Sequence, residues 1–344
     1  MKLGLVTLRK AASFRNQADL IYKAAVHEGY EVSYLDMTKL VGPPKETWDK
    51  VIALIPLWPR YIFSITKLTA PWMSRSHILY GPVDGPFQTN IGLFNIMKNM
   101  RLVVPSMWCK EMIMRNNVKV FDVIPHGIDH ADFDFSDTKR YTRLAMLRKK
   151  YPNRTILFSN LNPLARKGFH HLTVALHILN TRIKDKFVFI LHTGLGEALK
   201  VEPELLKTPN LVVEDAYNRL PFRAIAEKTC ACDVFVFPSL LEGFGLPLLE
   251  AAAAKRTIVC LDSGPMNEIV GPKEAYLFPY HTIKEERWNN GSIAQLHEYD
   301  PADLAYAMET AILEKKESRD RAEAAYTKSL DFDYLKVYTK LVNM

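Results

Sequence analysis

Short apolar runs alternate with amphipathic stretches along almost the whole chain. Each apolar run is continuous rather than alternating, and three of the intervening stretches, residues 16–30, 168–185 and 220–231, have the amphipathic pattern of helices. Continuous apolar strands separated by helices indicate parallel sheets that are covered on both faces. The predicted strands lie at residues 3–8, 31–36, 50–57, 77–83, 101–106, 119–125, 154–159, 186–192, 210–215, 233–238 and 256–262.

A polar, acidic stretch at residues 130–139 separates the first six predicted strands from the last five. The number of strands on each side predicts two doubly wound α/β domains of comparable size, residues 1–140 and 141–330. The residues after Asp300 have a helical pattern, and residues 280–300 are predicted to form an irregular surface insertion.

Composition supports a globular protein with two cores. The chain has 344 residues, of which 48% are hydrophobic and 24% charged, as expected for two α/β domains. No apolar run is long enough for a bilayer span, and the first residues become charged too soon for a secretory signal. We therefore expect a cytoplasmic protein whose four cysteines are buried thiols rather than disulfides or zinc ligands.

The net charge of +7 is unevenly distributed. Residues 1–140 contain 18 Lys and Arg against 13 Asp and Glu, a net charge of +5. Such a surface suits an anionic partner, which could be a phosphorylated acceptor, a membrane surface or nucleic acid. Because no Lys/Arg run concentrates this charge, a merely soluble surface fits the same numbers. Trp58, Arg60, Tyr61 and Trp72 lie in an apolar and basic stretch that is either core or a membrane contact.

The most informative motif is "DVFVFPSLLEGFGLPLLEAAAA", which begins at Asp233. A buried strand is followed by a loop with Glu242, Gly243 and Gly245 and by a helix with Glu250 near its start. Loops at the carboxyl ends of parallel strands bind ligands, and a helix start favours anions. Carboxylates accept hydrogen bonds from sugar hydroxyls, so a nucleotide-sugar fits both features. The alternative is a strand–turn–helix with two surface glutamates.

A second strand–loop–helix segment, "RTILFSNLNPLARKGFHHL", places two cations before a helix. Arg166 and Lys167 stand at the end of the loop and Gly168 opens the helix. A guanidinium and an ammonium in this position can bind a diphosphate and neutralise it as a leaving group. The alternative is that both residues are solvated charges on a loop. Two basic residues directly before Gly168 make this alternative less favoured.

Together these segments resemble the retaining nucleotide-sugar glycosyltransferases of family 4, which have the GT-B fold. The resemblance covers most of the chain and is strongest at residues 101–275. The "EGFGLPLLEA" match, with two glutamates separated by seven residues, is highly specific. The resemblance implies two Rossmann-like domains facing each other across a cleft. It also implies that the last helix, residues 331–344, returns to pack on the first domain.

The resemblance also implies residue roles. Glu250 would bind the ribose hydroxyls of the donor, and Glu242 would hold hydroxyls of the transferred sugar. Arg166 and Lys167 would bind the diphosphate together with the backbone of Gly245. Tyr217 would stack on the base or simply pack. The other predicted donor-binding residues lie on the same loop: Ser239, Gly243, Phe244 and Leu246.

The first domain departs from the family pattern in two places. Residues 6–17 contain no glycine, whereas many members have a glycine-rich loop after the first strand. Asp84, between two glycines at a strand end, stands where many members have a histidine that contacts the donor sugar. It is a catalytic candidate beside Glu242, Arg166 and Lys167, although a turn-forming aspartate explains it equally well. His126 is a weaker candidate for a donor contact. We expect neither a metal ion nor another cofactor.

The predicted activity is sugar transfer from a nucleoside-diphosphate sugar to an acceptor hydroxyl with retention of configuration, that is, a retaining hexosyltransferase. The acceptor would be a carbohydrate, a lipid or another hydroxyl compound, and peripheral membrane contact stays open. The alternatives are a sugar-nucleotide epimerase, a phosphorylase-like enzyme, and a catalytically silent protein that binds nucleotide-sugars or nucleic acid. Nucleic acid binding is disfavoured because the donor-side residues are complete.

Overall fold

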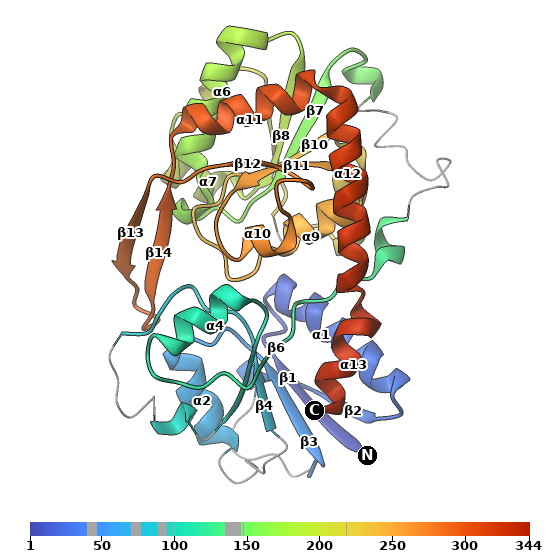
Figure 1. The fold of residues 1–344 in the computed structure, drawn as a ribbon, viewed down its shortest axis with the longest axis vertical. Coiled ribbons are helices and arrows are strands. Elements are labelled where there is room, and N and C mark those ends of the chain that lie inside the picture. The colour runs from blue at the N-terminus through green and yellow to red at the C-terminus, as the bar shows by residue number, and fades with distance from the viewer. Residues whose placement is uncertain are drawn as a thin grey trace. The chain divides into compact units, whose positions relative to one another are not determined.

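The computed structural model describes residues 1–39, 47–69, 77–88, 95–98, 100–134, 146, 148–217 and 219–344. The predicted domain boundary at 140/141 and Trp72 lie outside these residues. The chain forms two compact units (Figure 1). Unit 1 comprises residues 1–129, 285–295 and 331–344, and unit 2 comprises residues 130–284 and 296–330.

Unit 1 is built on a six-stranded parallel sheet. Its order is β2-β1-β3-β4-β5-β6. The strands are β1 (Lys2–Thr7), β2 (Glu31–Asp36), β3 (Lys50–Leu54), β4 (His77–Tyr80), β5 (Arg101–Val104) and β6 (Asp122–Val123). The helices are α1 (Ala12–His27), α2 (Pro59–Thr69), α4 (Met107–Met114) and α13 (Tyr334–Asn343), with a 3-10 turn at Met37–Lys39. The strands β3 to β5 are buried at nearly every position, as their continuous apolar runs predict.

Unit 2 contains a second six-stranded parallel sheet. Its order is β12-β11-β10-β7-β8-β9. The strands are β7 (Thr155–Asn160), β8 (Phe187–Thr193), β9 (Leu211–Asp215), β10 (Val234–Phe237), β11 (Thr257–Leu261) and β12 (Tyr276–Phe278). The helices are α6 (Phe169–Ile183), α7 (Leu195–Val201), α8 (Phe222–Ala231), α9 (Leu246–Ala253), α10 (Met266–Ile269), α11 (Pro301–Leu313) and α12 (Lys315–Ser329). Short 3-10 helices occur at His130–Phe133, Ala165–Lys167, Leu205–Lys207 and Leu330–Phe332.

All eleven predicted strands are present, and both predicted parallel sheets are confirmed. The prediction for residues 280–300 was wrong. This segment contains a two-stranded hairpin, β13 (Thr282–Arg287) and β14 (Ile293–Glu298). Nearly every residue of β13 is exposed, so the strand lacks the buried apolar pattern from which the other strands were predicted.

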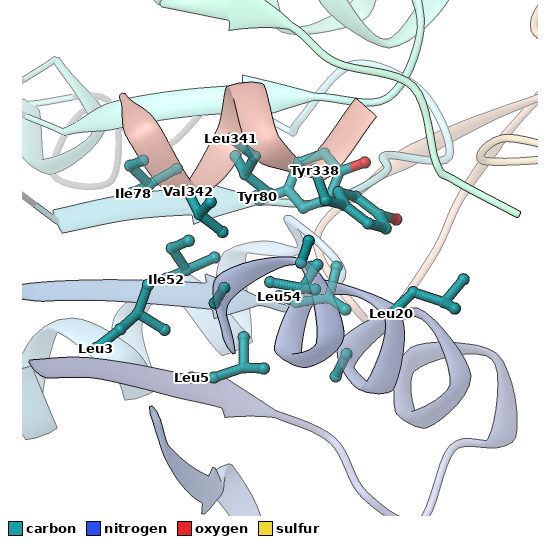
Figure 2. Packing of buried hydrophobic residues seen from close by; sticks show 14 of the residues in the cluster. Leu3, Leu5, Leu20, Ile52, Leu54, Ile78, Tyr80, Tyr338, Leu341 and Val342 are labelled. Atoms are coloured by element: carbon teal, nitrogen blue, oxygen red, sulfur yellow. The ribbon is translucent and has the colours of Figure 1, made fainter. Parts of the chain in front are cut away.

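The last helix packs on the core of unit 1, as predicted. Tyr338, Leu341 and Val342 of α13 are fully buried and belong to one hydrophobic cluster with Ile78 and Tyr80 of β4 (Figure 2). The helix start is capped by Asp333, whose carboxylate accepts the N–H groups of Leu335 and Lys336. At the other end the Tyr30 hydroxyl and the Lys50 ammonium donate to the Val342 carbonyl at 3.0 and 2.6 Å.

Candidate active site

The loop between β10 and α9 depends on a glycine at the helix start. Gly245 is the N-cap residue of α9 and has a φ of +105°, a left-handed conformation that favours glycine. Pro247 fits the first turn of the helix because no intrahelical hydrogen bond is needed there. The carboxyl end of a buried strand therefore runs directly into a helix start. This geometry places Glu242 and Gly243 in the connecting loop.

The loop between β7 and α6 lies against this first loop. The strands β7 and β10 are parallel neighbours, so their carboxyl ends meet at the same sheet edge. The Leu240 amide donates to the Arg166 carbonyl at 2.9 Å, and Arg166 Nη1 donates to the Leu241 carbonyl at 2.6 Å. Gly168 has a φ of +74°, and a Cβ atom there would lie 2.1 Å from the Pro238 carbonyl oxygen. The two predicted motifs therefore form one continuous site in unit 2.

The site contains a cluster of three charges, in which Lys167 and Glu242 are buried and Arg166 is partly accessible. Lys167 Nζ donates to Glu242 Oε1 at 2.5 Å, and Arg166 Nη1 lies 3.9 Å from Glu242 Oε2. Glu242 and Lys167 are only 6% and 9% exposed. Burial by itself would raise the pKa of Glu242, but the charges of Lys167 and Arg166 outweigh it and hold that pKa below its usual value. Two cations against one carboxylate leave an excess positive charge beside the start of α9.

The carboxylate of Glu250, unlike that of Glu242, has no cation beside it among the described residues. Glu250 lies in α9, one turn after the helix start, and is half-buried. Among the described residues, no side chain forms an ion pair or hydrogen bond with its carboxylate. Burial raises the pKa of Glu250 to about 7. A half-buried carboxylate without a partner is available to accept hydrogen bonds from a ligand.

This raised pKa predicts a measurable pH dependence. Between about pH 4.5 and 7 the native state keeps a proton on Glu250 that the unfolded chain has lost, so stability falls as pH rises through this range. We expect the free energy of unfolding of ligand-free Glu250→Gln to lie within about 1 kcal/mol of the wild type at pH 5 and to exceed it by about 2–3 kcal/mol at pH 8. Urea unfolding at both pH values measures this difference. A constant difference between the two proteins at pH 5 and pH 8 would contradict the raised pKa.

The other predicted donor residues differ in how deeply they are buried. Ser239 and Phe244 are buried, whereas Gly243 and Leu246 are partly accessible. Tyr217 lies beyond β9, where its amide donates to the Thr193 carbonyl at 3.3 Å. Burial raises the pKa of Tyr217, with Arg166 lowering it and Glu242 raising it. Its hydroxyl therefore lies within the electrostatic reach of the cluster, and its contact with a base stays a prediction.

Two residues that support the loop were missed by sequence reasoning. The Tyr299 hydroxyl donates to the Pro238 carbonyl at 2.7 Å, and the His297 amide donates to the Leu240 carbonyl at 2.9 Å. His297 lies in β14 and Tyr299 directly after it, about 60 residues from the loop in sequence. No local pattern marks them, because their role depends on a contact that only the folded unit creates.

The two remaining candidates belong to unit 1. Asp84 is buried, and its Oδ2 accepts the indole N–H of Trp58 at 2.7 Å. His126 is also buried, with Nδ1 at 2.9 Å from the Tyr80 hydroxyl and 3.3 Å from the Tyr338 hydroxyl. Burial lowers the pKa of His126 to about 3, so the ring is neutral at physiological pH. Its observed contacts anchor α13, and the predicted donor contacts of Asp84 and His126 stay predictions.

A cavity of about 530 Å³ lies elsewhere in unit 2, beside the amino ends of β10 and β11. Tyr326, Lys255 and Arg256 are among its lining residues, and none of the predicted site residues lines it. Its cations already have partners, since Lys255 pairs with Glu323 at 3.2 Å and Arg256 donates to the Cys232 carbonyl at 3.1 Å. We therefore place the candidate site at the carboxyl edge of the sheet.

Neither a metal-ligand cluster nor a helix that could span a membrane occurs within the residues that the structure describes. In the described part of the chain, no group of three or more His, Cys, Asp or Glu side chains is arranged to hold a metal ion. No helix within the described ranges has both the length and the apolarity that crossing a membrane requires. Metal independence, the cytoplasmic location and peripheral membrane contact stay predictions.

Known proteins resemble the chain in fold and, over part of it, in sequence. The glycosyltransferase from Rickettsia africae matches 99% of this chain and 96% of its own with a TM-score of 0.73 at 14% identity. HepE of Anabaena, in complex with UDP and glucose, matches 100% and 98% with a TM-score of 0.74 at 13% identity. Sucrose-phosphate synthase from Thermosynechococcus elongatus matches 100% and 98% with a TM-score of 0.73 at 14% identity. The fold is that of the GT-B glycosyltransferases.

The family match falls mainly on the unit that carries the candidate donor site. Residues 152–311 match the model of the glycosyl transferases group 1. The serotype-specific mannosyltransferase WbdA of Escherichia coli is 28% identical over 173 residues, which are 47% of this chain. The chain spans about a fifth of the length of this curated relative, because the match covers 20% of it. The group 1 glycosyltransferase match includes every predicted donor-site residue of unit 2.

Proposed function

We propose that the protein transfers a sugar from a nucleoside-diphosphate sugar to an acceptor hydroxyl, with retention of configuration and without a metal ion. The observation that carries this proposal is the cluster of Lys167, Arg166 and Glu242 beside the start of α9. Its excess positive charge suits a diphosphate. The group 1 glycosyltransferase match over residues 152–311 supports it, as do the HepE complexes, which contain UDP and glucose.

Each charged residue then has a separate task. Lys167 and Arg166 stabilise the diphosphate as it departs, and the backbone at Gly245 donates hydrogen bonds to it. Glu242, held ionised by Lys167, accepts hydrogen bonds from the hydroxyls of the transferred sugar. Glu250 accepts those of the ribose. All four residues lie in unit 2, so donor recognition belongs to one unit.

In the transfer step, each bond that breaks is matched by a bond that forms. The bond between the anomeric carbon and the diphosphate oxygen breaks, and a bond to the acceptor oxygen forms on the same face of the sugar. The acceptor proton passes to the departing diphosphate oxygen. The two cations and the helix start neutralise the charge that a divalent metal would otherwise neutralise.

A nucleotide screen followed by product analysis tests this function. We expect one of UDP, GDP, ADP, TDP and CDP to raise the melting temperature. At a hundredfold excess over its Kd, that nucleotide should add about 2.7 kcal/mol to the free energy of unfolding. The matching sugar donor should give a product with retained configuration, at the same rate in EDTA. A changed donor sugar without any acceptor would favour an epimerase, and a requirement for inorganic phosphate would favour a phosphorylase. Binding without turnover would favour a silent binding protein.

A further inference from the structure

Arg60 of unit 1 is held over two aromatic rings. It lies in the first turn of α2, after the carboxyl end of β3. Its guanidinium carbon is 5.1 Å from the centre of the Trp58 ring and 4.7 Å from that of Tyr61, and Nη2 donates to the Tyr61 hydroxyl at 3.2 Å. The two rings are stacked with centres 5.6 Å apart. Stacking of this kind fixes the orientation of an exposed guanidinium.

No carboxylate neutralises this guanidinium among the described residues. Several other arginines do pair with acids, such as Arg182 with Glu309 at 2.9 Å and Arg148 with Asp233 at 2.5 Å. The carboxylate at the neighbouring strand end, that of Asp84, is buried and accepts the Trp58 indole N–H. The guanidinium N–H groups of Arg60 that do not contact Tyr61 are therefore available to an anion from solution.

The start of α2, which carries Arg60, lies against the hairpin tip. Gly291 has a φ of +91°, and a Cβ atom there would lie 2.6 Å from Cγ of Pro59. The same tip pairs with the segment after Asp84, because the Gln88 amide donates to the Gly291 carbonyl at 2.9 Å and the Ile293 amide to the Pro86 carbonyl at 2.7 Å. Asp84 therefore binds the Trp58 indole, and the hairpin tip lies close against Pro59, between Trp58 and Arg60 in the chain.

The same sheet edge carries a second arginine stacked on a ring. Arg9 follows β1, the parallel neighbour of β3, and its guanidinium carbon is 4.8 Å from the centre of the Tyr34 ring. Arg9 is exposed, as is Lys10, and no described carboxylate forms an ion pair with either. Asp36, the acid at the end of β2, is engaged by the amide and hydroxyl of Thr38 at 3.0 and 2.8 Å. Burial by itself would raise the pKa of Asp36, but the hydrogen bonds from Thr38 and the charges of nearby cations hold that pKa below its usual value. The carboxylate stays ionised, so this edge of unit 1 carries charges of both signs.

From these contacts we infer that the acceptor carries a phosphate group and that Arg60 binds it. The inference rests on the proposed function, since it names the class of acceptor for that reaction. A planar guanidinium fork matches the geometry of phosphate oxygens. The stacked rings hold the fork in place, so little side-chain entropy is lost on binding. The phosphate belongs either to a soluble sugar phosphate or to a lipid headgroup.

Paired acceptors test the inference once the nucleotide screen has identified the donor. The soluble arm compares glucose with glucose 6-phosphate, mannose with mannose 6-phosphate, and inositol with inositol phosphate. The lipid arm compares vesicles of phosphatidylinositol in phosphatidylcholine with phosphatidylcholine alone. We expect the wild type to prefer the phosphorylated member of one arm in kcat/KM. Arg60→Gln should reduce that preference about tenfold or more, mainly through the acceptor KM.

Two further variants separate recognition from structure. Arg60→Lys keeps the charge but loses the planar fork, so its preference should fall between those of the wild type and Arg60→Gln. Arg182→Gln removes an arginine that already pairs with Glu309, and the preference should not change. An equal preference in wild type and Arg60→Gln, or faster transfer to the neutral members, would overturn the inference and leave the proposed function intact. Failure of every nucleotide to bind would overturn both.

Discussion

Lys167→Ala is expected to slow sugar transfer by about 10²–10³-fold, because it removes a preorganised charge from the departing diphosphate. It should also destabilise the fold by about 3–5 kcal/mol, since Glu242 would stay buried without its main partner. Single-turnover rates and urea unfolding measure the two effects. Both follow from one contact, the 2.5 Å pair of Lys167 and Glu242.

A second substitution separates the two effects. In Lys167→Ala/Glu242→Gln the uncompensated charge is gone, so most of the lost stability should return while the transfer rate stays low. Lys200→Ala is the matched control, because Lys200 pairs with Glu197 on the exposed surface and should change neither quantity. Recovery of full activity in the double variant would mean that Lys167 only neutralises Glu242 and does not act on the donor.

Glu250→Ala is expected to weaken binding of the nucleoside diphosphate by about 10²-fold, since two hydrogen bonds to a charged acceptor would be lost. Calorimetric titration of the nucleotide identified in the screen measures this change. Because the pKa of Glu250 is about 7 in the free protein, wild-type affinity should rise as the pH passes through 7. Binding at pH 6.5 should release a proton, which titrations in buffers of different ionisation enthalpy would detect.

The matching deoxynucleotide shows whether Glu250 contacts the ribose. A 2′,3′-dideoxynucleoside diphosphate should bind the wild type about as weakly as Glu250→Ala binds the ordinary nucleotide, and the variant should not distinguish the two. Glu204→Ala, which removes a surface glutamate paired with Lys207, should bind like the wild type. If the wild type and Glu250→Ala lose the same affinity when the two ribose hydroxyls are removed, then Glu250 does not contact the ribose.

Much of the fold was predictable because its strands are buried on both faces. A strand such as β8, in which all seven residues are buried, must be apolar throughout and is visible in any sequence. The hairpin β13–β14 was missed for the converse reason, since its first strand is solvent-exposed. Its tip is specified by contacts with Pro59 and Gln88, about 200 residues earlier in the chain.

The candidate donor site was predictable to a similar degree. Gly245 and Gly168 both adopt a positive φ, which favours glycine, and each loop follows directly from a buried strand. Sequence reasoning could not show that Lys167 pairs with Glu242, because the two residues are 75 positions apart. Nor could it place His126, whose neighbours come from β4 and from the last helix.

The sequence by itself determined the two parallel sheets, the loops at their carboxyl edges and the residue types on those loops. These features follow from local rules, namely the burial of strands, the φ preference of glycine and the anion preference of helix starts. Only the tertiary structure decided which charges meet. It buried Lys167 against Glu242, 75 positions away, and left the carboxylate of Glu250 without a described partner. The physical reason is that burial and partner distance set the pKa and the availability of a charge, and both depend on residues far apart in the chain.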